Sequence, residues 1–266
     1  MIILKNKHIN APVTPIFFLS TGRTATQWLA WALNVCYPSV LAVHEPPPMI
    51  KPVGLLYHAG KLKFNDAVRA CKKARLANVR CARILYKKCY YVECNHNLFS
   101  LAEPLRKAFP GCKIVGLVRD YKTFIPSMAN RGYSNGVGWL KSDEPKIDTG
   151  KKQLAWYWKE KISAYMDQVD YLVKMEKLLY SRCGIVFPQN SNVIFQQNIY
   201  NWNILFNKLG FSKIDQKTYN YISGKSFNTA KRGAMPNWEQ WPDSDKQDVI
   251  DIIGQNFLKE LDRKVL

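Results

Sequence analysis

The fold is decided by one stretch of the chain, Phe17-Phe18-Leu19-Ser20-Thr21-Gly22-Arg23-Thr24-Ala25-Thr26-Gln27-Trp28-Leu29. An apolar run ends in a turn of small and hydroxyl residues, and the residues that follow have helical spacing. A strand, a tight loop and a helix N-terminus form an anion cradle, because free backbone N–H groups and the positive helix end point at one place. Arg23 adds a permanent charge, and Thr24 and Thr26 add hydroxyl donors. The stretch predicts a phosphate or sulfate site; the alternative is an ordinary turn with a solvated arginine.

Strand-like and helix-like patterns alternate along the whole chain. This alternation predicts an α/β fold with a parallel sheet, which we expect to form a single domain, 1–266. Asp120 is placed to cap the helix that follows residue 120. The predicted strands are 16–19, 40–43, 83–86, 90–92, 113–118 and 192–195, and the predicted helices are 65–76, 98–109, 154–173, 199–209 and 243–261.

Several polar residues fall at or near the carboxyl ends of predicted strands. They are Thr21, Glu45, Glu93 and Arg119. In a parallel sheet, ligands bind beyond these ends, so we expect the four residues to border one site. Residues 131–150 are rich in Gly, Ser, Asp and Lys and indicate a long loop, a common form of lid or binding loop.

The net charge is unusually positive: 39 Lys and Arg stand against 20 Asp and Glu, which gives +19. Such a charge favours anionic ligands or surfaces. The densest basic stretch, 61–83, is best interpreted as a solvated helix face, and the chain contains no known nucleic-acid-binding motif. A specific anionic partner for this face remains an alternative.

Cysteine spacing and apolar runs bear on the compartment. The seven cysteines are scattered, and no pair shows the C-x-x-C spacing of a zinc or redox site. No apolar run approaches the roughly 20 residues that span a bilayer, and residues 16–19 are too few for a signal peptide. We therefore expect a cytoplasmic protein with free thiols and without a bound metal.

The loop departs from that of nucleotide triphosphatases. Their motif, G-x-x-x-x-G-K-[ST], uses lysine to reach the phosphates and a hydroxyl to hold Mg²⁺. The Gly-Lys-Ser/Thr end is missing here. In addition, Arg119 beside Asp120 suits a phosphate better than a metal.

Three segments, in order, resemble the sulfotransferases that use 3′-phosphoadenosine 5′-phosphosulfate. Residues 21–29 resemble the family's 5′-phosphosulfate loop. Residues 114–120, followed by Ser127, resemble its 3′-phosphate motif, and residues 231–238 resemble its C-terminal Arg-Lys-Gly…Trp segment. The resemblance implies a P-loop-like three-layer α/β/α fold with a central parallel sheet. It also implies 3′-phosphoadenosine 5′-phosphosulfate as the donor, with 3′-phosphoadenosine 5′-phosphate as its product.

The resemblance assigns roles to individual residues. Arg23 takes the place of the loop lysine or arginine that stabilises the departing phosphate, and Trp28 matches a tryptophan that packs on adenine, the alternative being a core residue. Ala25 replaces a glycine common in the family, so the backbone there must avoid positive φ or accept strain. The implied donor-binding residues are Thr21, Gly22, Arg23, Thr24, Ala25, Thr26, Gln27, Trp28, Arg119, Ser127, Lys231, Arg232 and Gly233.

Sulfuryl transfer requires a base for the acceptor. Glu45 is the first candidate and His44 the second, since both follow the second strand and relatives carry an acid at this place, whereas other branches use a later histidine. The alternative is that His44 packs and Glu45 pairs with a loop arginine. Residues 91–96 resemble the family's acceptor-side segment. The acceptor-pocket candidates are Glu93, Asn95, His96 and Tyr133, with helix capping by Asn95 as the structural alternative.

The sequence therefore predicts an enzyme that moves a sulfuryl group, in line and without a metal, to a hydroxyl or amine. We expect a small-molecule acceptor and neither a membrane nor a nucleic-acid partner. Two alternatives stay open: a P-loop small-molecule kinase, and a basic protein that binds nucleic acid or another polyanion.

Overall fold

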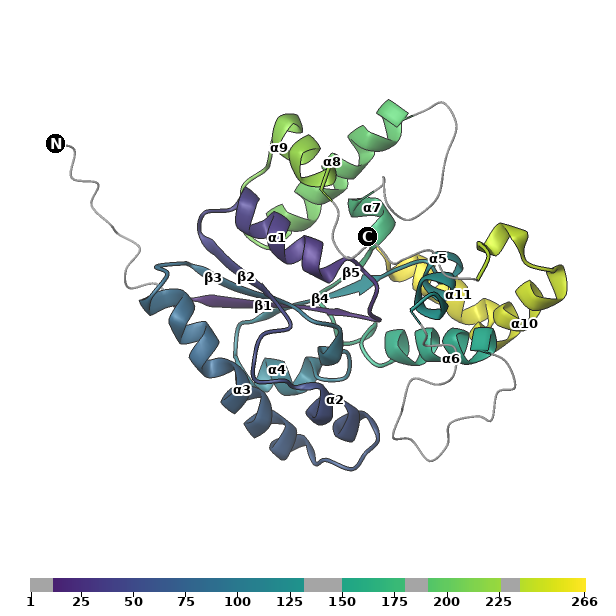
Figure 1. Ribbon diagram of the computed structural model, residues 1–266. Coiled ribbons are helices and arrows are strands. Elements are labelled where there is room, and N and C mark those ends of the chain that lie inside the picture. The colour runs from purple at the N-terminus through teal and green to yellow at the C-terminus, as the bar shows by residue number, and fades with distance from the viewer. Residues whose placement is uncertain (1–11, 132–149, 180–190, 226–234) are drawn as a thin grey trace.

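The computed structural model describes residues 12–131, 150–179, 191–225 and 235–266. They contain one five-stranded sheet in the order β2-β3-β1-β4-β5, with every neighbouring pair parallel (Figure 1). This confirms the predicted α/β fold with a central parallel sheet. The strands are β1 Thr14–Ser20, β2 Val40–His44, β3 Tyr90–Cys94, β4 Lys113–Val118 and β5 Tyr171–Lys174.

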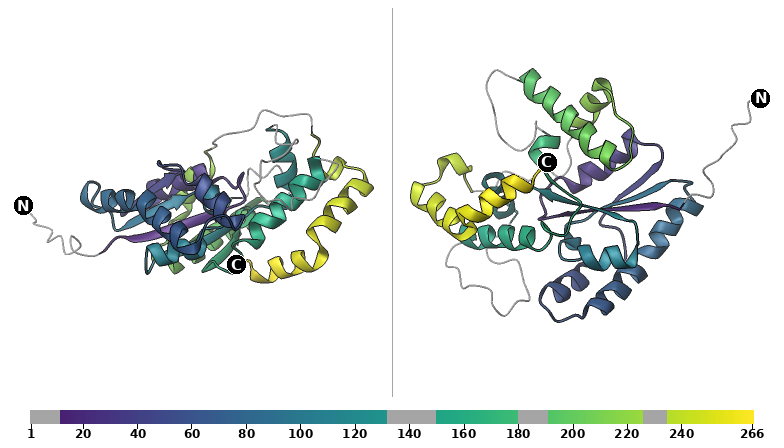
Figure 2. Two further views of the ribbon diagram at one scale, coloured as in Figure 1. Left: turned by 90° about the horizontal axis from the view of Figure 1, so that it is seen from below. Right: turned by 180° about the vertical axis from the view of Figure 1, so that it is seen from behind.

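Helices cover both faces of the sheet. Side chains alternate along β1, so that Ile16 and Phe18 face one core while Phe17 and Leu19 face the other. Helices α1, α8 and α9 close the first core, and α3, α4 and α6 close the second (Figures 1 and 2). The long helices are α1 Thr26–Cys36, α2 Lys51–His58, α3 Phe64–Ile84, α4 Ala102–Ala108, α5 Tyr121–Ala129, α6 Gly150–Ser163, α8 Ser191–Lys208, α9 Gln216–Ser223, α10 Asp243–Ile253 and α11 Gln255–Lys264. Short turns of helix are η1 His96–Leu98, α7 Met175–Leu178 and η3 Trp238–Gln240.

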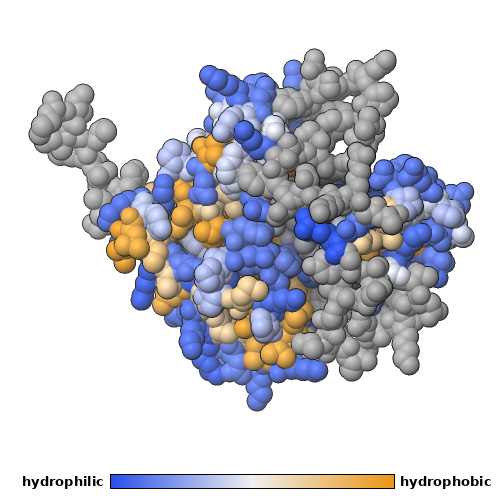
Figure 3. Space-filling model, viewed as in Figure 1, coloured by the Kyte–Doolittle hydropathy of each residue, from blue (hydrophilic) through white to orange (hydrophobic). Residues whose placement is uncertain are grey.

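Four sequence-based assignments of secondary structure are wrong. Residues 192–195 belong to α8, and the fifth strand is β5, whose residues overlap the predicted helix 154–173. The predicted strand 83–86 is the end of α3 and the turn after it, where Ile84 and Leu85 are exposed. Figure 3 shows an orange, hydrophobic patch at the left of the molecule, where the end of α3 lies in Figure 1. The last predicted helix is divided by Gly254, whose φ of 85° only glycine adopts freely.

The order of the strands places the switch in connection direction, where a crevice is expected, between β1 and β3. The chain leaves β1 toward β2 on one side, whereas it leaves β3 toward β4 on the other side. Figure 1 shows the two following helices on opposite faces, α1 above the sheet and α4 below it. Connections that diverge in this way leave an opening at the carboxyl ends of the strands, where ligands of α/β sheets bind. Among the described residues, no helix is both long and apolar enough to cross a membrane.

Candidate active site

The loop after β1 has an unusual backbone. Gly22, Arg23 and Ala25 have φ values of 89°, 54° and 52°. The left-handed region costs a residue with a Cβ atom roughly 1–2 kcal/mol, so the loop stores strain at Arg23 and Ala25. Ala25, which replaces a glycine common in the resembled family, therefore adopts a strained backbone conformation. The tight path lets α1 begin at Thr26, at the edge of the crevice.

Two features of this loop suit an anion. Ala25 is the N-cap of α1 and provides no side-chain cap to the first-turn amides, which in any α-helix lack intrahelical partners. The Thr24 side chain is 1 % exposed, and its hydroxyl has no hydrogen-bond partner in the described parts of the chain. Leaving such a group unpaired costs about 1–3 kcal/mol, which a bound oxygen would recover. This orphaned hydroxyl fits the phosphosulfate end of the proposed donor.

Two arginines connect this loop to α5. Arg119, just after β4, donates from Nη1 to the Arg23 carbonyl at 2.9 Å and to Ser127 Oγ at 3.3 Å. The Arg23 Nε donates to the same Ser127 Oγ at 3.2 Å. Asp120 caps α5 as predicted, accepting a hydrogen bond from Lys122 N at 2.9 Å. The positively charged pair and the serine hydroxyl form a second anion point beside the loop.

The structure describes only some of the other residues predicted to bind the nucleotide donor. Buried Thr21 donates to the Gly22 carbonyl at 3.2 Å, and Gln27 lies half-buried in the first turn of α1. Lys231, Arg232 and Gly233 lie outside the described residues. Just after them, Met235 N donates to Asn130 Oδ1 at the end of α5, at 3.0 Å.

Trp28 is a core residue. It is buried, its indole Nε1 donates to the Ile222 carbonyl at 2.9 Å, and its ring packs edge-on to Trp202. A ring committed in this way has no open face for adenine, so the adenine-packing interpretation is replaced by its core alternative. The reason is the amphipathic character of α1, which buries its aromatic residues against α8 and α9.

Glu45, His44 and His96 form an accessible acid–base group beside the loop. Glu45 Oε1 lies 2.5 Å from His96 Nδ1 and 3.6 Å from His44 Nε2. His44 Nε2 contacts Thr26 Oγ1 at 3.0 Å. A Cβ atom on Gly22 would lie 3.7 Å from His96 Cδ2, so the histidine ring packs against the loop backbone. The side chains of Glu45 and His96 are 25 % and 33 % exposed, which leaves room for an acceptor.

The charges within this group are well defined. Burial raises the pKa of Glu45, but the hydrogen bond from His96 and the charges of His96, His44 and Lys161 outweigh it and bring the pKa below its usual value. Burial is the main cause that lowers the pKa of His96, and Lys161 adds to it. An ionised Glu45 beside a neutral His96 requires the imidazole proton on Nδ1. The unprotonated Nε2 is then able to accept a proton.

Lys161 is a residue that the sequence analysis missed. Its side chain is buried in α6, and its Nζ lies 4.7 Å from the Phe99 ring centroid and 4.8 Å from that of Tyr157. Burial, together with the charge of Lys51, lowers its pKa to about 7, although Glu45 acts in the opposite direction. A signal was available, because residue 161 falls on the apolar stripe of α6, seven positions after Leu154.

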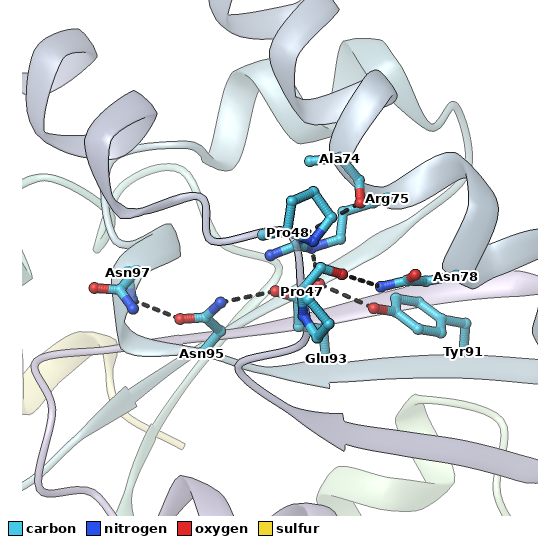
Figure 4. A network of polar contacts seen from close by, with 9 residues as sticks. All are labelled: Pro47, Pro48, Ala74, Arg75, Asn78, Tyr91, Glu93, Asn95 and Asn97. Atoms are coloured by element: carbon cyan, nitrogen blue, oxygen red, sulfur yellow. Dashed lines mark hydrogen bonds and ion pairs between the residues drawn. The ribbon is translucent and has the colours of Figure 1, made fainter.

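Glu93 and Asn95 lie in a buried network behind this group (Figure 4). Glu93 is fully buried and accepts from Arg75 Nε at 2.5 Å, Tyr91 Oη at 3.1 Å and Asn95 Nδ2 at 2.8 Å. Asn95 also accepts from Asn97 N at 2.9 Å, which is the capping alternative. Both side chains are buried and bonded within this network, so among the described pocket candidates only His96 is partly exposed; Tyr133 lies outside the described residues.

Comparisons with known proteins do not assign a function to this chain, so the proposed function rests on the residues of the site. No protein-family model matches the chain. No curated protein matches it either. A solved structure, a sulfotransferase domain from the curacin biosynthetic pathway, has a TM-score of 0.47 at 12% sequence identity; the similarity covers 91% of this chain and 97% of that one.

Proposed function

We propose that this protein is a sulfotransferase that moves a sulfuryl group from 3′-phosphoadenosine 5′-phosphosulfate to a hydroxyl or amine of a small molecule. One observation carries the proposal: Arg119 bonds both the anion loop and Ser127, so that two anion points share one crevice. A nucleotide with phosphate groups on both its 5′ and 3′ oxygens requires two such points. Simple phosphate binding requires only one.

The residues present fit this donor. The first-turn amides of α1 and the hydroxyls of Thr24 and Thr26 would hold its phosphosulfate end. Arg119 and Ser127 would hold the 3′-phosphate through charge-assisted hydrogen bonds. When bound, the nucleotide supplies an activated sulfuryl group and leaves as 3′-phosphoadenosine 5′-phosphate. Arg23 and the helix N-terminus would stabilise the negative charge that develops on the leaving phosphate.

His96 is the proposed base, with Glu45 as the residue that orients it. His96 Nε2 takes the proton of the acceptor hydroxyl or amine, and ionised Glu45 stabilises the resulting imidazolium through Nδ1–H. This revises the sequence-based order, which ranked Glu45 first and His44 second. The 2.5 Å contact between Glu45 and His96 explains the revision, because it commits the Glu45 oxygen to the imidazole. His44 is directed to Thr26 instead.

Calorimetric titration tests the donor site. 3′-Phosphoadenosine 5′-phosphate should bind at least about tenfold more tightly than adenosine 5′-monophosphate, because a hydrogen bond to a charged group contributes about 1.5–3 kcal/mol. Arg119→Gln and Ser127→Ala should reduce this preference. Arg80→Gln, an exposed change on α3, should leave it intact.

Two results would reject the proposal. One is equal binding of the two nucleotides. The other is binding of ATP that depends on Mg²⁺ with no response to the 3′-phosphate, which would favour the kinase. Retention on DNA or heparin that the nucleotide fails to displace would favour the polyanion-binding alternative.

A further inference from the structure

The turn that follows Glu45 is held from behind by α3. Asn78 Nδ2 donates to the Pro47 carbonyl at 3.3 Å, and Arg75 Nη1 donates to the Pro48 carbonyl at 2.8 Å (Figure 4). Glu45 itself has a φ of 45°, in the region that a side chain disfavours. A residue in this conformation persists only where its surroundings fix it. The two carbonyl contacts therefore fix the direction in which Glu45 leaves β2.

The other partner of the pair, His96, is held by the residues on both sides of it. Asn95 Oδ1 accepts from Asn97 N at 2.9 Å, which bridges across His96 and begins η1. Asn95 Nδ2 donates to Glu93 Oε1 at 2.8 Å. The backbone of His96 is thus anchored through Asn95 to the carboxylate of Glu93.

One buried ion pair connects the two anchors. Arg75 Nε donates to Glu93 Oε2 at 2.5 Å, and both side chains are 0% exposed. The guanidinium therefore bonds the turn after Glu45 and the carboxylate that fixes Asn95. A buried ion pair contributes little net stability, since desolvation offsets its attraction, and its best supported use is to specify one arrangement. Here the arrangement specified is the relative position of the two chain segments that carry Glu45 and His96.

We propose that Arg75, Asn78, Glu93 and Asn95 are positioning residues for the Glu45–His96 pair. They touch neither donor nor acceptor and act by holding Glu45 Oε1 on Nδ1 of His96, which keeps Nε2 as the proton acceptor. The catalytic consequence rests on the proposed function. The positioning itself does not, because the tautomer of His96 is a property of the protein alone.

The test reads this tautomer directly. Free neutral imidazole favours the Nε2–H form, whereas a carboxylate on Nδ1 enforces the Nδ1–H form. Long-range ¹H–¹⁵N correlation spectra of the ¹⁵N-labelled protein distinguish the two, at a pH where the imidazole is neutral. The signals of His96 are identified by their loss in His96→Gln.

Two variants loosen the network in different ways. Arg75→Lys keeps a positive charge beside Glu93, but a single ammonium group cannot at the same time donate to the Pro48 carbonyl as the guanidinium does. Asn78→Ala removes the contact to Pro47 and the side-chain hydrogen bond with Tyr91, and it leaves the Arg75–Glu93 ion pair in place. Because the position is partly exposed, we expect this variant to fold, and it provides the test if Arg75→Lys does not fold. Arg80→Lys, exposed on the same helix, is the matched control.

We expect the wild type and Arg80→Lys to show the Nδ1–H form, and both network variants to gain the Nε2–H form. Turnover should fall by about 10- to 100-fold in kcat with unchanged affinity for 3′-phosphoadenosine 5′-phosphate, since displacement by about 1 Å costs this much. A His96 tautomer in Asn78→Ala identical to that of the control would overturn the positioning role. Failure of the wild type to bind the nucleotide would instead reject the proposed function and leave the tautomer result standing.

Discussion

Two carboxylates lie at the same edge of the sheet, and they differ in nearly every physical respect. Glu45 follows β2, whereas Glu93 is on β3, where it pairs in register with Val43 of β2. Glu45 is 25 % exposed and bonded to His96. Glu93 is 0% exposed and bonded to Arg75.

The difference shows what a proton-transferring pair requires. Histidine gains or loses its proton near neutral pH, whereas arginine keeps its charge at any pH that proteins experience. The accessible pair can therefore exchange a proton with an acceptor. The buried pair is closed to ligands, and its arginine does not exchange a proton, so the pair holds structure. Breaking each pair separately should produce different kinds of loss.

The largest expected effect is on stability, in Glu93→Gln. The change leaves Arg75 buried with no carboxylate, and breaking a buried pair in this way costs about 3–5 kcal/mol of unfolding free energy. Urea denaturation measures it. Glu103→Gln, an exposed change on α4, should stay within about 0.5 kcal/mol of wild type. A loss below about 1 kcal/mol for Glu93→Gln would mean that the ion pair does not have the structural role assigned to it.

The next effect is on turnover, in His96→Gln. Loss of the base should lower kcat by about 10²- to 10³-fold, or about 3–4 kcal/mol of barrier, with nucleotide affinity preserved. In the wild type, activity should be lost as pH falls through the pKa of His96, which lies below 6.5, because the protonated ring cannot accept a proton. His44→Gln is the comparison variant. A larger loss in it than in His96→Gln would transfer the role of base to His44.

Lys161→Met should have a smaller effect and the opposite sign on stability. Burial lowers the pKa of Lys161 from its usual 10.5 to about 7 in the folded protein. Burying the charged amine therefore costs folding free energy in full below pH 7, and this cost decreases as the pH rises toward 10.5. The variant should gain about 1–3 kcal/mol near neutral pH and less in alkali. The acid limb of activity should move to higher pH, since Lys161 lowers the pKa of His96.

Thermal unfolding over a range of pH measures this gain. Lys107→Met, exposed at the end of α4, is the control and should show no pH-dependent gain. Equal behaviour of the two variants would show that Lys161 carries no buried charge.

The smallest effect is expected in Ala25→Gly. Glycine relieves the left-handed strain at this position but adds freedom to the unfolded chain, so the net gain is at most about 1 kcal/mol. Donor binding should be unchanged. Ala30→Gly, inside α1, should instead lose about 1 kcal/mol. Thermal unfolding measures both variants. If Ala25→Gly is destabilised as much as Ala30→Gly, Ala25 is not strained.

The sequence predicted local features well and long-range packing poorly. The predicted strand 113–118 has the same bounds as β4, and Asp120 caps α5, because both features depend on neighbouring residues. Residues 171–173 of β5 were assigned to the predicted helix 154–173, since a four-residue buried strand has no distinctive period. Lys161 and Arg75 escaped notice for a related reason. Basic residues on helices usually face solvent, and this expectation outweighed the position of Lys161 on an apolar stripe; the tertiary fold shows that both side chains are buried.

The predictions for the site differ in the same way: local features were predicted, and a long-range contact was not. The loop was predicted from its own pattern, and the resemblance to the sulfotransferase family pointed to Arg119 and Ser127. The structure brings all three together. The pairing of Glu45 with His96 was not predicted, because 51 residues separate them and their contact depends on the adjacency of β2 and β3. Trp28 is the opposite case. The resemblance to the family suggested that Trp28 contacts a ligand, but the packing of α1 buries it in the core.

The central claim is that the accessible pair carries the proton in a sulfuryl transfer. The most direct test incubates the protein with 3′-phosphoadenosine 5′-phosphosulfate and a panel of phenols, alcohols and amines without added metal, and follows product mass for wild type and His96→Gln. The proposal predicts an acceptor that gains one SO₃ unit, matched by released 3′-phosphoadenosine 5′-phosphate, at a rate that falls sharply in the variant. A rate unchanged in His96→Gln, or no SO₃ transfer to any member of the panel, would contradict it.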